Sequence, residues 1–128
     1  MKIAFFSDIH ANLHAFKAML EDLDSQKPDT AYCLGDLVGY NIYPNEVIGE
    51  ICKRGIATLK GNHDEKVDSI DSTPESLNEK GENYAYHLIS EDNRGYLKKT
   101  SSPHKYRVYI RGSDFQDCFG SWKHKTYR

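Results

Sequence analysis

The chain has 128 residues, which suits one globular domain and is too short for two full domains. Its hydrophobic fraction of 38% and charged fraction of 28% are those of a globular protein, and 17 basic against 19 acidic side chains leave a net charge of −2. This near-neutral balance gives no indication of nucleic acid as a partner. The apolar start MKIAFF ends at Ser7-Asp8, too early for a signal peptide or a membrane span, so we expect a cytoplasmic protein without a membrane partner.

The three cysteines, Cys33, Cys52 and Cys118, are widely spaced and include no C-x-x-C pair. Their odd number and spacing argue against a disulfide framework and against a thiolate zinc site. We interpret Cys33 and Cys52 as small buried hydrophobic residues, one in a strand and one in a helix.

The first half of the chain alternates between strand and helix patterns. Residues 2–7, KIAFFS, form an apolar run that predicts a buried strand. Asn12 can cap a helix that runs to about Asp24. One face of this helix carries Leu13, Phe16, Leu20 and Leu23. Residues 30–34, TAYCL, predict a second strand.

The same unit then repeats. Pro44 suits the first turn of a second helix, and Gly55 suits the position just past its end. The residues expected to face inward from this helix are Val47, Ile48, Ile51 and Cys52. Residues 56–60, IATLK, predict a third strand. This alternation predicts an α/β fold with a parallel sheet and right-handed crossovers.

From about Glu75 to Lys99 the pattern becomes helical and polar, with a break near Ser90 that separates two helices. Their apolar faces carry Tyr84, Leu88, Ile89, Tyr96 and Leu97. We expect His87 to lie on the surface of the first helix.

Polar side chains follow all three predicted strands. Asp8 and His10 follow the first strand, Asp36 follows the second, and the GNHD stretch at residues 61–64 follows the third. Because the carboxyl ends of parallel strands meet at one crevice, these side chains should lie close together. Oxygen and imidazole ligands without sulfur suit a divalent ion such as Mn, Fe or Zn rather than a structural zinc.

Each of these motifs alone is common as a turn or a packing residue, and only their placement at three successive strand ends indicates a metal site. Gly35 and Gly61 precede Asp36 and Asn62. A glycine there allows a tight turn that brings the next side chain toward an ion.

The segments FSDIHAN, GDLVGYNIYPNEVI and LKGNHD, in this order, resemble the calcineurin-like metallophosphoesterases. GDLVGY to PNEV, and ENYAYHLISEDNRGYLKKTSSPHK at residues 82–105, are similar to their small bacterial and archaeal phosphodiesterase branch. The likeness implies the amino-terminal half of a four-layer α/β/β/α sandwich. We therefore expect an incomplete metallophosphoesterase-like domain at residues 1–110 and an irregular, atypical tail at residues 111–128.

The resemblance implies two divalent metal ions. Asp8 and His10 would bind the first ion, Asp36 would bridge both, and Asn62 would bind the second through its side-chain oxygen. Mn²⁺ is the expected ion, with Fe, Zn, Ni or Mg as alternatives. The substrate would be a phosphate ester attacked by metal-activated water.

The resemblance also assigns roles to the next two residues of GNHD. His63 would face the substrate and stabilise or protonate the leaving oxygen, and Asp64 would orient its ring. Tyr40 and Tyr43 either line the crevice or pack within their loop, and His14 is expected to be solvated or at the edge of the core.

The second half of the chain departs from the family pattern. Arg111 stands where a histidine is expected after the strand-like residues 106–110, and no Gly-His-x-His follows. The second sheet of the sandwich would be largely absent, so that one face of the first sheet stays open and favours self-association.

Two functions follow from these observations. The first is a metal-dependent phosphoesterase, most simply a phosphodiesterase with a dinuclear centre. The alternative is a truncated, non-catalytic remnant that binds metal or phosphate weakly or acts by association with another chain.

Overall fold

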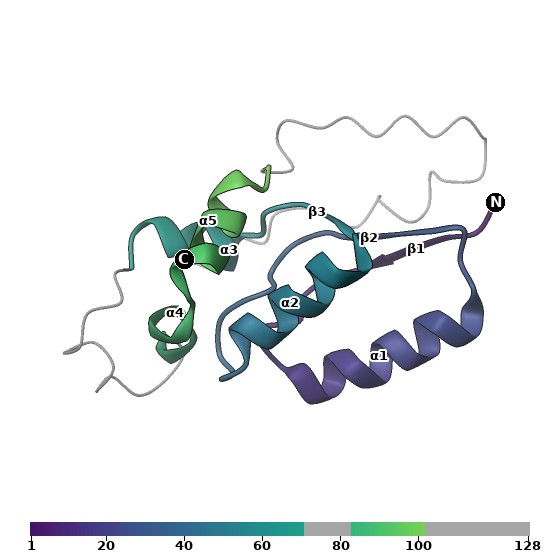
Figure 1. The fold of residues 1–128 in the computed structure, drawn as a ribbon, viewed down its shortest axis with the longest axis horizontal. Helices are drawn as coiled ribbons and strands as arrows, with labels where there is room; N and C mark the ends of the chain where they lie inside the picture. Colours follow the sequence, from purple (N-terminus) through teal and green to yellow (C-terminus); the bar gives the residue numbers. More distant parts are fainter. Residues whose placement is uncertain (71–82, 102–128) are drawn as a thin grey trace, which may run out of the picture.

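The computed structural model describes residues 1–70 and 83–101. Its sheet has the order β1-β2-β3 and both neighbouring pairs are parallel (Figure 1). The strands are β1 (Ile3–Phe6), β2 (Thr30–Cys33) and β3 (Ala57–Thr58). This arrangement confirms the predicted α/β fold with a parallel sheet flanked by helices.

Helix α1 (Leu13–Gln26) begins at the predicted cap, where the Asn12 side chain accepts a hydrogen bond of 3.1 Å from the Ala15 amide. It extends two residues beyond the expected end and closes at Lys27, which adopts a left-handed conformation with φ of 48°. Its buried face consists of Leu13, Phe16 and Leu20. Local capping and periodicity therefore account for this helix.

Helix α2 (Pro44–Arg54) also matches the prediction, since Pro44 opens it and Gly55 closes it in a left-handed conformation. The buried residues are Pro44, Val47, Ile48 and Ile51. The prediction for Cys52 was wrong, because this side chain is exposed. At 100° per residue, Cys52 lies outside the stripe that the other apolar residues of α2 turn toward the core.

Helices α1 and α2 contact each other and cover one face of the sheet (Figure 1). On that face Phe6 packs against Phe16, with ring centroids 6.0 Å apart. On the opposite face Phe5 and Tyr32 stack at 5.6 Å and stay 38% and 39% exposed. The prediction of β1 as a fully buried strand was therefore wrong, because described helices pack against one face of it only.

Four short elements lie at the carboxyl end of the strands (Figure 1). They are α3 (Asn62–Glu65), the 3-10 helix η1 (Lys66–Asp68), α4 (Tyr84–Leu88) and α5 (Glu91–Lys99). The predicted break is confirmed at Ser90, whose side chain accepts a hydrogen bond from the Asn93 amide and caps α5. His87 is only 7% exposed, so its predicted surface position was wrong; α4 is too short for an apolar period to identify its buried face.

The third strand is shorter than the five residues predicted. Beyond Thr58, Leu59 forms a single parallel bridge with Ser101, and the Lys60 amide donates to the Ser101 carbonyl. The residue 110 boundary and the tail at residues 111–128 lie outside the described residues. Within residues 1–70 and 83–101, no helix has the length and apolar character needed to cross a membrane.

Candidate metal centre

The loops that follow β1 and β2 are joined by backbone hydrogen bonds. The Asp8 amide donates to the Gly35 carbonyl at 3.3 Å, and the His10 amide donates to the Asp36 carbonyl at 2.9 Å. The pairing of the two strands thus continues past their ends. These bonds hold the backbones of the two loops side by side and so fix the positions from which their side chains extend.

The loop after β3 lies directly against the loop after β2. Gly35 has φ of 112°, and a Cβ at this position would lie 2.3 Å from the Gly61 nitrogen. A Cβ on Gly61 would lie 2.2 Å from Oδ1 of Asp36. Because neither contact is sterically possible, the close approach of these two loops requires glycine at both positions, as the sequence indicated.

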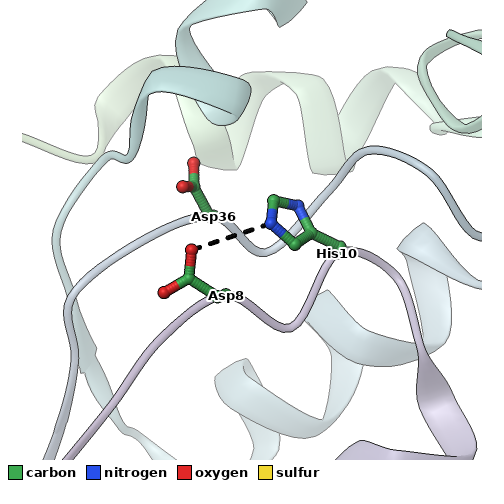
Figure 2. A group of neighbouring side chains, drawn as sticks. All are labelled: Asp8, His10 and Asp36. Atoms are coloured by element: carbon green, nitrogen blue, oxygen red, sulfur yellow. Dashed lines mark ion pairs between the residues drawn. The ribbon is translucent and has the colours of Figure 1, made fainter. Parts of the chain in front are cut away.

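Three of the predicted ligands converge at this edge of the sheet. One ligand atom from each of Asp8, His10 and Asp36 lies within 4.8 Å of the other two (Figure 2). Nε2 of His10 is 3.7 Å from Oδ1 of Asp8. The Asp8 side chain is 63% exposed and the His10 side chain 20% exposed, so the group is open to solvent on the Asp8 side.

The contacts of His10 determine its tautomer. Nδ1 lies 3.1 Å from the carbonyl oxygen of Val38, which can only accept a hydrogen bond. Nδ1 therefore carries the proton, and Nε2 offers its lone pair beside Asp8. This is the arrangement of a metal-binding histidine whose second nitrogen is held by a carbonyl.

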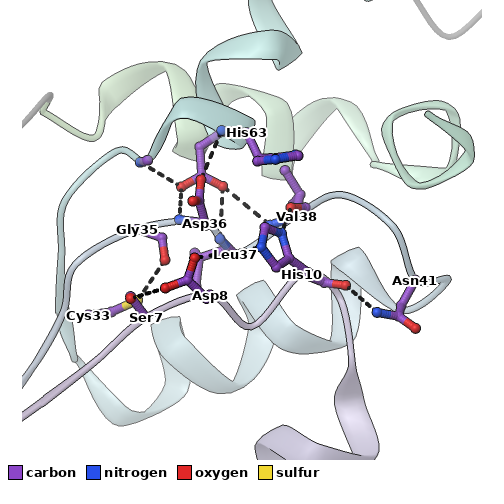
Figure 3. A network of polar contacts seen from close by, with 12 residues as sticks. Ser7, Asp8, His10, Cys33, Gly35, Asp36, Leu37, Val38, Asn41 and His63 are labelled. Carbon is purple, nitrogen blue, oxygen red and sulfur yellow. Dashed lines mark hydrogen bonds and ion pairs between the residues drawn. The ribbon is translucent and has the colours of Figure 1, made fainter. Parts of the chain in front are cut away.

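Asp36 is oriented by the third loop. Oδ1 of Asp36 accepts a hydrogen bond of 2.8 Å from the His63 amide (Figure 3). The preceding residue, Asn62, is the first residue of α3 and is exposed. The structure thus places the predicted fourth ligand on the segment that holds Asp36.

The backbone of the three converging residues is strained. Asp8, His10 and Asp36 have φ of 59°, 49° and 56°, in the left-handed region that residues other than glycine seldom adopt. Such residues cost about 1–3 kcal/mol each and cluster at functional sites, where surrounding contacts hold them. Here the paired loops supply those contacts.

Asp64 has a different environment from the one predicted. It is 1% exposed, and its carboxylate accepts hydrogen bonds from backbone amides. The donors are Asp36 at 2.8 Å, Leu37 at 2.9 Å, Val38 at 3.3 Å and Gly61 at 2.9 Å. Burial raises the pKa of Asp64 to about 6, while the bonds from the Gly61 and Val38 amides lower it. Asp64 therefore clamps two loops together, because both of its oxygens accept hydrogen bonds from backbone amides.

The ring of His63 instead contacts aromatic and imidazole groups. Its Nδ1 lies 3.1 Å from the Tyr86 hydroxyl. Its centroid is 4.7 Å from that of His10, at an interplanar angle of 77° (Figure 3). It is 5.0 Å from the centroid of the Tyr40 ring. Tyr40 is 50% exposed, and its ring contacts the rings of both His10 and His63. Tyr43 instead packs against the exposed His14. Of the two tyrosines, Tyr40 therefore lines the site.

Sequence reasoning did not identify Gly39 or Tyr86. Gly39 has φ of 103°, and a Cβ there would lie 2.9 Å from Nδ1 of His63 and 3.4 Å from Nδ1 of His10. Its position in GDLVGY was a signal that could have been used, since a glycine soon after a strand often permits a close approach. For Tyr86 the local pattern gave no signal.

Comparison with known proteins identifies the family. The sequence model of the calcineurin-like phosphoesterases matches residues 1–125. The chain belongs to this family.

The proteins similar to this chain are longer than it is. It is 44% identical over 62 residues to an uncharacterized protein of Methanocaldococcus jannaschii, a match that spans 48% of this chain and 26% of that protein. The metallophosphoesterase structure from Sphaerobacter thermophilus is 29% identical and superposes with a TM-score of 0.65, over 78% of this chain and 41% of that one. The chain therefore spans less than half the length of these relatives and corresponds to the amino-terminal part of the fold.

A second solved structure supports the same fold. It is described as a candidate diadenosine tetraphosphatase, is 22% identical, and superposes with a TM-score of 0.56 over 77% of this chain and 47% of that one. At this level of identity the likeness shows the fold alone.

The residues at this site fit a divalent cation. The donor set combines two carboxylates with an imidazole nitrogen whose lone pair is available. Oxygen and nitrogen donors of this kind suit Mn, Fe and Zn. Hydrogen bonds to the Val38 carbonyl and from the His63 amide orient the imidazole of His10 and the carboxylate of Asp36.

Proposed function

We propose that this chain, which corresponds to the amino-terminal part of the metallophosphoesterase fold, is itself a metal-dependent phosphodiesterase with a dinuclear centre. The observation that carries the proposal is the convergence of the Asp8, His10 and Asp36 ligand atoms within 4.8 Å, in a chain of the calcineurin-like phosphoesterase family. A phosphate diester is the proposed substrate, and the cytoplasm is the proposed location.

Asp8 and His10 would hold the first ion, Asp36 would be shared between two ions, and Asn62 would bind the second. Two divalent ions, proposed as Mn²⁺, would supply charge neutralisation of the phosphoryl group and activation of the attacking water. The protein's part is to hold the donors in place, which the Val38 carbonyl does for His10 and the His63 amide does for Asp36.

His63 is the residue proposed to act on the leaving oxygen. Its ring contacts the rings of His10 and of the exposed Tyr40, so a phosphate ester bound at the metal site would contact His63. Asp64 contributes indirectly, because it fixes the turn that carries Asn62 and His63.

The test is hydrolysis of bis(p-nitrophenyl) phosphate by the purified 128-residue chain, with Mn²⁺ and with a chelator. We expect activity that requires the metal, is lost in Asp36→Asn and is kept in Asp22→Asn, which changes an exposed carboxylate on α1. A folded, Mn²⁺-loaded chain without activity would contradict the proposal for this chain and would favour a non-catalytic remnant that binds metal without turnover.

A further inference from the structure

Tyr86 is a buried tyrosine whose hydroxyl faces a histidine of the site. Its side chain is 0% exposed, and its hydroxyl oxygen lies 3.1 Å from Nδ1 of His63. Tyrosine hydroxyls that are buried in a core usually form a hydrogen bond, because leaving them without a partner costs free energy. The contact joins α4 to α3, two elements that are far apart in sequence.

The position of Tyr86 is fixed by side chains from two other helices. Arg94 of α5 is 5% exposed, and its guanidinium donates to the Tyr86 carbonyl and to the carbonyls of Val67, at 3.1 Å, and Ile70, at 2.8 Å. Asn45 of α2 donates to the Leu88 carbonyl at 2.8 Å. A five-residue helix has little stability of its own, so these bonds hold α4 under the site.

The backbone of the GDLVGY loop leaves space for this contact. A Cβ on Gly39 would lie 2.9 Å from Nδ1 of His63 and 3.3 Å from the Tyr86 hydroxyl. Any other residue at this position would push against both partners of the hydrogen bond. The conformation of this loop and the Tyr86–His63 contact therefore depend on each other.

The chemistry of the two groups indicates the direction of the bond. An unprotonated imidazole nitrogen is a better acceptor than a phenol oxygen, and a phenol is a good donor. We propose that Tyr86 is a positioning residue that donates its hydroxyl hydrogen to Nδ1 of His63 and keeps the proton of the ring on Nε2. This inference rests on the proposed function only where it has the Nε2–H of His63 donate to a bound phosphate ester.

The two histidines at this edge of the sheet then hold opposite tautomers. His10 donates from Nδ1 to the Val38 carbonyl and offers the Nε2 lone pair, as a metal ligand must. His63 accepts at Nδ1 and presents Nε2–H, which can donate to an oxygen of a bound phosphate ester but cannot bind a cation. The Val38 carbonyl at Nδ1 of His10 and the Tyr86 hydroxyl at Nδ1 of His63 thus give two adjacent imidazoles different roles. His10 can bind a metal ion, and His63 can donate a hydrogen bond.

The test is long-range ¹H–¹⁵N NMR of the metal-free, ¹⁵N-labelled chain at mildly alkaline pH, where a free imidazole is neutral. The ring signals are assigned by their loss in His10→Gln and His63→Gln. We expect a protonated Nδ1 in His10, and in His63 a protonated Nε2 with a hydrogen-bonded, unprotonated Nδ1. In Tyr86→Phe, the Nδ1 signal of His63 should shift to that of a nitrogen without this bond.

Tyr84→Phe is the matched control, because it removes a hydroxyl from the same helix, and it should leave the His63 signals in place. A protonated Nδ1 of His63 in the unaltered chain would overturn the proposal, and so would a His63 Nδ1 signal that does not move in a folded Tyr86→Phe variant. The measurement on the unaltered chain decides the point if that variant fails to fold.

A kinetic readout separates this inference from the proposed function. If the unaltered chain hydrolyses the diester, Tyr86→Phe should lower kcat about 10-fold with little change in KM, as expected for loss of an outer hydrogen-bond partner. If Tyr86→Phe has the same kcat as the unaltered chain, the Nε2–H of His63 has no role in catalysis. If the unaltered chain is inactive, the proposed function fails, while the NMR result still decides the tautomer of His63.

Discussion

Asp64 and Asp8 are carboxylates at the same edge of the sheet, and their surroundings are opposite. Asp64 is 1% exposed and accepts four backbone amides, whereas the Asp8 side chain is 63% exposed and lies beside a second carboxylate and an imidazole. Asp64 accepts hydrogen bonds from the backbone amides of two loops, at residues 36–38 and at Gly61. Asp8 adds negative charge to an open group on a strained backbone.

This difference separates stability from function within one loop cluster. Backbone donors that are buried and bonded stabilise the fold, whereas carboxylates held near one another without a counter-ion do not. The Asp64 clamp should therefore be needed for folding, and the Asp8-His10-Asp36 group should be needed only for binding an ion. Substitutions can test the separation directly.

The largest expected effect on stability is that of Asp64→Ala. Removing the carboxylate leaves several buried amide donors without an acceptor, which should lower the free energy of unfolding by about 3 kcal/mol or more. Urea denaturation of the metal-free chain measures this change. Glu65→Ala, at the exposed neighbouring position of α3, should change it by less than about 0.5 kcal/mol. Equal stability of the two variants would contradict a structural role for Asp64.

The complementary substitution is Asp8→Asn. Asparagine tolerates the left-handed backbone at this position, so the fold should keep its stability in the presence of a chelator. Loss of a charged ligand should weaken Mn²⁺ binding by at least about 10- to 100-fold, as measured by calorimetric titration. Asp22→Asn serves as the control. Unchanged Mn²⁺ affinity would remove Asp8 from the metal site.

A pair of glycine substitutions sharpens the comparison between loop and scaffold. Gly39→Ala places a methyl group 2.9 Å from Nδ1 of His63 at φ of 103°, and should destabilise the fold by about 1–3 kcal/mol. Gly49→Ala, within α2 and with nothing within 4 Å of its Cβ, should stabilise it by about 0.5–1 kcal/mol. Thermal unfolding measures the change in stability of both variants. A change of the same sign in both would contradict the described packing around Gly39.

The smallest expected effect is a difference in the alkylation of Cys33 and Cys52, which reports how accessible each thiol is. Burial raises the pKa of Cys33, which lies beneath the site, to about 12, whereas Cys52 is exposed. Iodoacetamide at neutral pH should therefore alkylate Cys52 in the native chain and Cys33 only after unfolding, because the thiolate is the reactive form. Peptide mass spectrometry distinguishes the two sites. In Asp64→Ala, faster labelling of Cys33 would report opening of the clamp.

The sequence predicted those parts of the fold that local chemistry determines. Asn12, Pro44, Gly55 and Ser90 mark helix ends in the structure as they do in the sequence. The convergence of Asp8, His10 and Asp36 was also predictable, because parallel strands bring their carboxyl ends together. Capping and topology need only short segments of sequence, so they could be deduced without coordinates.

The contacts under the site could not be predicted in this way. The partners of Asp64 lie up to 28 residues away, and Tyr86 reaches His63 from a helix of five residues that shows no apolar period. The buried Arg94 was also missed, because an arginine bonded to carbonyls looks like a surface residue in the sequence. Each of these contacts depends on tertiary packing, which a local pattern does not encode.

The clamp made by Asp64 also bears on the order of events during folding. Three of its hydrogen bonds join Asp64 to the amides of residues 36–38, so they can form only after the second crossover has closed. Contacts between segments so distant in sequence tend to form late. An ion bound by Asp8, His10 and Asp36 would need the same loops in place, so it would act mainly on the native state. Mn²⁺ should therefore slow the unfolding of this chain far more than it speeds folding.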